Sequence, residues 1–109
     1  MQLRTGYVEA VATAEHRRGR GIAGAVLAEV ERLVTGGFEL GALSASEEGA
    51  ALYTARSWTR WSGPIAALTP GGVVDCPGEL VFARRTPHTP RRVDSSAPLV
   101  CDWRRGDLW

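Results

Sequence analysis

The sequence predicts a small domain of the α/β or α+β class whose sheet mixes parallel and antiparallel strands. Three observations indicate this class. Patterns typical of strands and helices alternate from residue 6 to residue 58, and further strand patterns follow. The chain has 109 residues, which suits one small domain, and 44% of them are hydrophobic, as in a globular protein. The sequence contains no internal repeat.

The first strand is predicted over residues 6–13, GYVEAVAT, from the apolar residues that it carries. A helix is expected after the loop AEHRRGRG, with apolar residues at helical spacing and an end at Gly36 and Gly37. The predicted core stripe of this helix consists of Ile22, Val26, Val30 and Leu33.

A second strand and a second helix are predicted next. Residues 38–44, FELGALS, have a strand pattern, and Ser44 and Glu47 have the spacing of a capping box at the start of the helix SASEEGAALYTARS. Strands are then expected around TRWSG, PIAALT and ELVFARR, with a turn at the PGG of residues 70–72. Residues 86–98 contain three prolines and are predicted to form a loop.

Charge and cysteine content restrict the classes of function. The formal net charge is +1, so no strong attraction to nucleic acid or to a membrane surface follows. No apolar run in the sequence has the length of a membrane span. Cys76 and Cys101 fit no metal-site spacing, so no metal is expected. We expect two reduced thiols and a cytoplasmic protein.

The junction between the first strand and the first helix has the properties of an anion site. Residues 18–23, RGRGIA, place glycines and arginines where a helix begins. The first N–H groups of a helix have no partner within it, and glycine lets a phosphate approach the backbone. A Walker loop is excluded because the chain lacks lysine. The glycines also lie too far beyond the strand for a dinucleotide fingerprint, and the pattern R-x-x-G-x-A fits better.

This R-x-x-G-x-A pattern resembles the acyl-coenzyme A signature of the GNAT superfamily of N-acetyltransferases. AALYTARSW, residues 50–58, resembles the second recurrent element of that superfamily, a helix with a tyrosine a few residues before a Gly-aromatic pair. GYVEAVA, LGALSAS and the ending CDWRRGDLW extend the resemblance to the aminoglycoside 2′-N-acetyltransferases of actinobacteria. The resemblance runs from about residue 6 to the end and is weakest between residues 70 and 98.

The resemblance implies the α+β acyl-CoA N-acyltransferase fold, with a mixed sheet and two helices. It also implies transfer of an acetyl group from acetyl-CoA to an amine. That amine would be the 2′-amino group of an aminoglycoside, as in antibiotic resistance, or that of a related amino sugar. Residues 1–109 would be part of one such domain, with the acetyl-CoA-binding core at 6–69 and the C-terminal strands and substrate-side tail at 70–109.

Two residues are implied in catalysis by the resemblance. Glu9, in the first strand, would act as a base, and Tyr53, on the second helix, would protonate the departing thiolate. A phenol whose ordinary pKa is about 10 is protonated at neutral pH and can donate that proton. The alternatives are a solvent-facing acid at Glu9 and a core residue at Tyr53.

The resemblance also implies the residues that bind the two substrates. Val11 and Thr13 would pair with the pantetheine arm of acetyl-CoA. The phosphates would be bound by Arg18, Gly19, Arg20, Gly21, Ile22, Ala23 and Gly24. Aminoglycosides are polycations, so acidic groups are expected around the acceptor. The implied acceptor contacts are Ser44, Glu79, Asp107 and the terminal carboxylate of Trp109, although Trp103 and Trp109 equally suit packing roles.

Two departures from the family pattern are visible. Members of the family have a further segment before the strand that here covers residues 6–13. The chain is therefore expected to be the C-terminal part of such an enzyme, prone to homodimer formation or self-association through a bare strand edge. Ser57 also stands where the family usually has glycine, at a position that suits left-handed backbone.

Two other classes of function stay open. One is a catalytically inactive, truncated remnant that binds coenzyme A without turnover. The other is a nucleic-acid module, suggested by RRGR, ARR, PRR and WRR. The twelve acidic residues and the lack of aromatic residues among the basic ones argue against it, so no nucleic-acid partner is expected.

Overall fold

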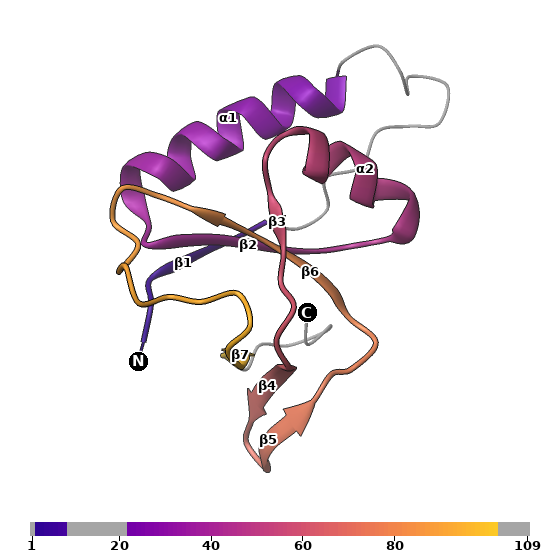
Figure 1. The fold of residues 1–109 in the computed structure, drawn as a ribbon, viewed down its shortest axis with the longest axis vertical. Coiled ribbons are helices and arrows are strands. Elements are labelled where there is room, and N and C mark those ends of the chain that lie inside the picture. The colour runs from indigo at the N-terminus through magenta and orange to yellow at the C-terminus, as the bar shows by residue number, and fades with distance from the viewer. Residues whose placement is uncertain (1, 9–21, 103–109) are drawn as a thin grey trace.

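The computed structural model describes residues 2–8 and 22–102 of the chain. Its larger sheet has four strands in the order β1-β2-β6-β3 (Figure 1). The parallel pair β1–β2 is joined to β6 and β3 by antiparallel pairing. These strands are β1 (Thr5–Val8), β2 (Leu40–Ala45), β3 (Thr59–Arg60) and β6 (Leu80–Arg85).

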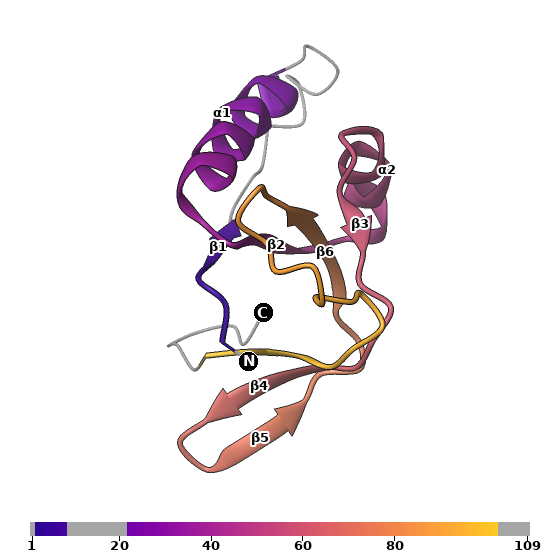
Figure 2. The same cartoon turned by 60° about the vertical axis from the view of Figure 1, so that its left-hand side comes forward.

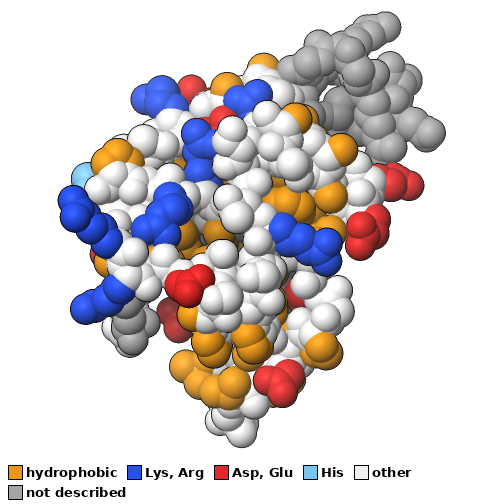
Figure 3. Space-filling view, viewed as in Figure 1, with side chains coloured by type: hydrophobic (Ala, Val, Ile, Leu, Met, Phe, Trp, Pro, Cys, Tyr) orange, Lys and Arg blue, Asp and Glu red, His pale blue; other side chains and the backbone are white. Residues whose placement is uncertain are grey.

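A smaller sheet has three strands in the order β5-β4-β7. Its members are β4 (Ile65–Thr69), β5 (Gly72–Asp75) and β7 (Leu99–Cys101). β4 and β5 form an antiparallel hairpin that projects from the rest of the chain (Figure 1). The turn lies at the predicted PGG, and Gly72 has a φ of 118°, which side chains rarely allow. Apolar side chains, including Leu68 and Val73, are exposed on this hairpin (Figure 3).

Two helices, α1 (Ile22–Gly37) and α2 (Glu47–Ala55), lie on one face of the larger sheet (Figure 2). The predicted α+β class, a mixed sheet with two helices, is thereby confirmed. The segment 86–98 is a loop, as predicted, and it crosses the other face of the sheet (Figure 2). No helix in the described ranges is both long and apolar enough to cross a membrane.

The buried face of α1 differs from the predicted stripe. Val26 and Leu33 are 47% and 55% exposed, whereas Leu27 is fully buried. Glu31 is only 7% exposed, and Val34 is buried beyond it. The predicted core stripe was wrong by one position along the helix. The face that packs against the sheet contains a glutamate, Glu31, which interrupts its apolar pattern. Val30 is half-buried at its edge, and the side chain of residue 22 lies outside the described part.

The strands of the larger sheet divide the core into two layers, because successive side chains point to opposite faces. The helical layer contains Leu27, Leu43, Tyr53, Trp58, Leu80 and Phe82. The opposite layer contains Leu40, Ala42, Trp61, Ile65, Val81 and Ala83. β4 and the segment 86–98 cover this second layer, so the sheet is buried on both faces.

The ends of α2 differ in part from the prediction. Its N-cap is Ser46, whose side chain accepts a hydrogen bond from the backbone N–H of Gly49 at 3.1 Å. The predicted capping box of Ser44 and Glu47 is wrong, because β2 continues to Ala45 and includes Ser44. Beyond the helix, Ser57 has a φ of 68°, the left-handed backbone expected where the family has glycine.

Candidate active site

Tyr53 lies in the second turn of α2 and is buried between the helix and the sheet, with 8% of its surface exposed. Its ring meets the ring of Trp58 edge to face, with centroids 6.3 Å apart, and that of Phe82 at 5.9 Å. Burial raises the pKa of the Tyr53 phenol above its ordinary value. Tyr53 is therefore protonated at neutral pH, the form that a proton donor needs.

Ser44 and Glu79 are brought together at the end of β2. The Ser44 hydroxyl donates a hydrogen bond to Glu79 Oε2 at 2.5 Å, although the residues are far apart in the chain. Ser44 lies one position beyond Leu43 on β2, so its side chain points to the sheet face opposite Tyr53. The structure thus unites two of the predicted acceptor contacts and separates them from Tyr53 by the thickness of the sheet.

The Cys101 thiol of β7 feels the charge of two carboxylates, one of them Glu79. Burial raises the pKa of the Cys101 thiol, and nearby Cys76, Asp102 and Glu79 raise it further by charge repulsion. Asp102 comes directly after β7, so the end of the described chain places a carboxylate next to Cys101. Such a surface favours a cationic ligand.

The predicted phosphate-binding segment ends at the start of α1. The backbones of residues 22–24 form the first turn of that helix. Gly24 is half-buried, and a Cβ atom added there would lie 3.7 Å from Nη1 of Arg56. The remaining predicted site residues lie outside the described part of the chain and stay predictions. They are Glu9, Val11, Thr13, Arg18, Gly19, Arg20, Gly21, Asp107 and Trp109.

Glu31, which was not among the predicted site residues, is a buried carboxylate that binds the residues next to Tyr53. Glu31 Oε2 accepts hydrogen bonds from Trp58 Nε1 at 2.8 Å and from Arg56 Nε at 3.0 Å. Its Oε1 atom accepts a third from Arg56 Nη2 at 2.7 Å. Arg84 Nη1 lies 3.9 Å from Oε2 and donates to the Arg56 carbonyl at 3.0 Å.

Glu31 is ionised in this setting. Burial alone would raise the pKa of its carboxyl, but hydrogen bonds from Arg56 and Trp58, with the charges of Arg56 and Arg84, lower it overall. We call Glu31, Arg56, Trp58 and Arg84 the Glu31 cluster. Glu31 comes four residues after Leu27 and therefore lies on the same face of the helix. This spacing is the only feature of the sequence that could have predicted the burial of Glu31.

The Glu31 cluster fixes the surroundings of Tyr53. The backbone N–H of Trp58 donates to the Tyr53 carbonyl at 2.9 Å, and the N–H of Arg56 donates to it at 3.1 Å. The indole of Trp58, held by Glu31, forms one wall against the Tyr53 ring. The position of the Tyr53 ring is thus set by contacts from the α2–β3 turn and β6, and α1 acts on it through Trp58.

No group of three or more His, Cys, Asp and Glu side chains that could hold a metal ion occurs within residues 2–8 and 22–102. The arrangement offers instead a buried phenol on one side of the sheet and an anionic hydrogen-bonded pair on the other. Proton donation and attraction of a cation are the chemistry that these groups can perform.

Comparison with known proteins adds independent information on the family that the chain resembles. No protein-family model matches the chain. The chain is 44% identical to a protein of Mycolicibacterium fortuitum named aminoglycoside 2′-N-acetyltransferase. The match covers 98% of this chain and 56% of the relative, so the chain spans about half the length of that protein. Over that part, the similarity confirms the resemblance to aminoglycoside 2′-N-acetyltransferases that the motifs indicate.

Proposed function

We propose that the protein takes part in transfer of an acetyl group from acetyl-CoA to an amine. The amine is the 2′-amino group of an aminoglycoside or of a related amino sugar. The observation that carries this proposal is the 44% identity, over 98% of the chain, to a protein named aminoglycoside 2′-N-acetyltransferase. The phenol of Tyr53, whose pKa is raised by burial, supports the proposal because it is in the protonated form that a proton donor needs.

Acetyl-CoA supplies the acetyl group as a thioester, whose sulfur must leave as a thiol. In the proposed reaction, the Tyr53 hydroxyl delivers a proton to that sulfur as the carbon–sulfur bond breaks. Glu9 takes the proton that the amine loses as the carbon–nitrogen bond forms. The predicted segment from Arg18 to Gly24 holds the cofactor phosphates, because it ends in the first turn of α1, where backbone N–H groups are available.

The ammonium groups of the acceptor that do not react are proposed to bind on the side of the sheet that carries Ser44 and Glu79. An aminoglycoside carries several ammonium groups, and the carboxylates of Glu79 and Asp102 would attract them. Asp107 and the carboxylate of Trp109 follow shortly after Asp102 in the sequence and would add to this charge. We also propose a cytoplasmic location, since Cys76 and Cys101 are both present as thiols, and a homodimer or other self-association.

The decisive experiment compares two aminoglycosides that differ at one group. Kanamycin B carries an amine at the 2′ position, and kanamycin A carries a hydroxyl there. With acetyl-CoA and the purified protein, we expect release of coenzyme A thiol with kanamycin B and none with kanamycin A. The mass of the product and its NMR spectrum would locate the acetyl group on the 2′ nitrogen.

Each other outcome has a definite meaning. Equal thiol release with both compounds would contradict transfer to the 2′ position. Binding of acetyl-CoA in calorimetry without turnover would instead identify the inactive coenzyme A-binding remnant. Failure to bind acetyl-CoA at all would overturn the proposed function.

A further inference from the structure

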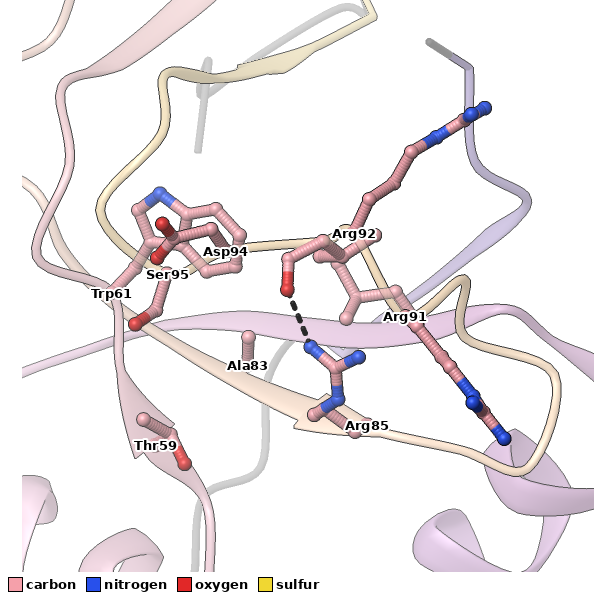
Figure 4. A pocket seen from close by; sticks show the side chains of 10 residues that line it. Thr59, Trp61, Ala83, Arg85, Arg91, Arg92, Asp94 and Ser95 are labelled. Atoms are coloured by element: carbon pink, nitrogen blue, oxygen red, sulfur yellow. Dashed lines mark hydrogen bonds between the residues drawn. The ribbon is translucent and has the colours of Figure 1, made fainter.

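A cavity of about 500 Å³ lies on the sheet face that is turned away from α1 and α2 (Figure 4). Its floor is formed by apolar side chains of Leu40, Trp61 and Ala83, all of them buried in the second core layer. The indole of Trp61 is held in place, since its Nε1 donates to the carbonyl of Ala97 at 2.7 Å. The cavity therefore has a rigid apolar floor that includes an aromatic ring.

Three arginines line the cavity. Arg85 is held by the segment 86–98, because its Nη1 donates to the Val93 carbonyl at 2.7 Å and its Nη2 to the Pro90 carbonyl at 3.1 Å. Arg91 and Arg92 are exposed, and neither forms an ion pair with any residue that the structure describes. Figure 4 shows both side chains at the rim of the cavity across from Trp61, with their guanidinium ends directed outward and away from each other.

Negative charge is scarce in the same cavity. Asp94 is the single carboxylate among its lining residues in the described chain, and it accepts a hydrogen bond from the backbone N–H of Ser96 at 2.9 Å. Figure 4 shows Asp94 beside Trp61, across the cavity from Arg91 and Arg92. Three guanidinium groups against one carboxylate leave the lining net positive.

We propose that this cavity binds a phosphate monoester whose organic part is flat and apolar. Guanidinium groups present paired N–H donors that match phosphate oxygens, and they stay charged at every physiological pH. The volume falls within the range of small-molecule sites, which are mostly apolar with a few placed polar groups. The floor would take the organic part beside Trp61, and the exposed side chains of Arg91 and Arg92 would turn inward from the rim to take the phosphate.

This site is separate from the proposed acetyl-CoA site. Residues 22–24 begin α1, on the helical face, whereas Leu40 and Ala83 point to the opposite face. The two sites can therefore be tested independently, and the cavity does not depend on acetyl transfer.

Phenyl phosphate is the probe for the first test. Its binding to the ¹⁵N-labelled protein would be followed by NMR through the indole N–H of Trp61. We expect a saturable shift, with an affinity about tenfold higher than that for inorganic phosphate or for phenol, because each lacks one half of the recognised ligand. Equal affinity for inorganic phosphate would overturn the proposal.

A pair of variants provides the second test. In Arg91→Gln/Arg92→Gln, both exposed guanidinium groups are lost without removal of an ion pair in the described structure. We expect phenyl phosphate affinity to fall about tenfold or more. The matched control is Arg60→Gln, an exposed arginine on β3 that pairs with Phe82 of the helical layer. Unchanged affinity in the double variant, or an equal loss in the control, would overturn the proposal.

Competition separates the two sites directly. An excess of acetyl-CoA should leave the phenyl phosphate shifts of Trp61 unchanged. Displacement of the probe by acetyl-CoA would show that phenyl phosphate occupies a coenzyme site, and it would overturn the separate cavity. Absence of acetyl-transfer activity alone would contradict the proposed function and would not affect this test.

Discussion

Glu31 is a buried charged residue that links α1 to the residues that follow α2. Its carboxylate accepts three hydrogen bonds from Arg56 and Trp58 while it is almost fully buried. Glu31→Ala would leave the Trp58 N–H without an acceptor and the Arg56 and Arg84 charges without a counter-charge. We expect the free energy of unfolding in urea to fall by roughly 2 to 4 kcal/mol.

The control for Glu31 lies on the same helix. Glu29 is exposed and forms an ion pair with Arg32 on the surface of the helix. Glu29→Ala should leave the unfolding free energy nearly unchanged, because exposed ion pairs contribute little. An equal loss of stability in the two alanine variants would contradict a special role of the Glu31 cluster.

The lowered pKa of Glu31 also predicts a dependence of stability on pH. A carboxyl whose folded-state pKa lies below its unfolded value contributes stability that is complete above the unfolded pKa and is lost as pH falls through the folded pKa. The stability difference between the wild type and Glu31→Gln should be constant above about pH 5 and should shrink below about pH 4. Urea titrations at several pH values would measure it, and a gap that widens in acid would contradict the assignment.

Tyr53 provides the residue-scale test of the proposed chemistry. Tyr53→Phe keeps the ring that packs against Trp58 and Phe82 and removes only the hydroxyl. If the phenol protonates the leaving sulfur, turnover of kanamycin B should fall roughly 10²- to 10⁴-fold, with acetyl-CoA affinity unchanged. Unchanged turnover, with acetyl transfer shown to limit the rate, would reduce Tyr53 to a packing residue.

At the scale of elements, the turn between α2 and β3 carries strain that one substitution can relieve. Ser57 has a φ of 68°, where a Cβ atom is disfavoured. Ser57→Gly should raise the unfolding free energy by about 0.5 to 1 kcal/mol, since the greater freedom of glycine in the unfolded chain offsets part of the relief. Ser57→Ala, which keeps the Cβ atom, is the control. Equal stability of the two variants would contradict strain at this position.

The elements also show where sequence patterns succeed. The end of α1 at Gly37, the strand at Leu40–Ala45 and the loop at residues 86–98 follow from glycine, apolar residues and proline. The buried face of α1 did not follow, because a glutamate paired through tertiary contacts occupies a core position. The short strands β5 and β7 depend on their pairing with β4, which local patterns do not contain.

At the scale of the whole molecule, the segment 86–98 packs closely against the backbone at Gly63, whose N–H donates a hydrogen bond to the Ser95 carbonyl at 2.9 Å. A Cβ atom there would lie 2.1 Å from the carbonyl oxygen of Ala97, so even alanine would force the segment outward. We expect Gly63→Ala to lower the unfolding free energy by about 1 to 3 kcal/mol. It should also change the NMR signal of the Trp61 indole N–H, which donates to the same oxygen.

Gly78→Ala serves as the comparison, because a Cβ atom at Gly78 would meet nothing within 4 Å. That variant should keep both the stability and the indole signal of the wild type. A Gly63→Ala protein with an unchanged Trp61 signal would show that the segment does not depend on this contact.

The candidate site could be predicted only in pieces. Motif resemblance indicated Tyr53, Ser44 and Glu79, and the structure brings the last two into contact. Their separation from Tyr53 depends on the exact register of β2, since a shift of one residue exchanges the two faces. Residues gathered from distant parts of the chain, such as Arg56 and Arg84 around Glu31, have no local signal in the sequence.

The Glu31 cluster has a consequence for how the molecule opens. It joins the middle of α1 to the residues that follow α2, so neither helix can leave the sheet without breaking the same ion pair. The two helices should therefore open as one cooperative unit in native-state hydrogen exchange, with amides of both sharing one dependence on denaturant. In Glu31→Gln that shared transition should divide in two, and α2, the shorter helix, should exchange first.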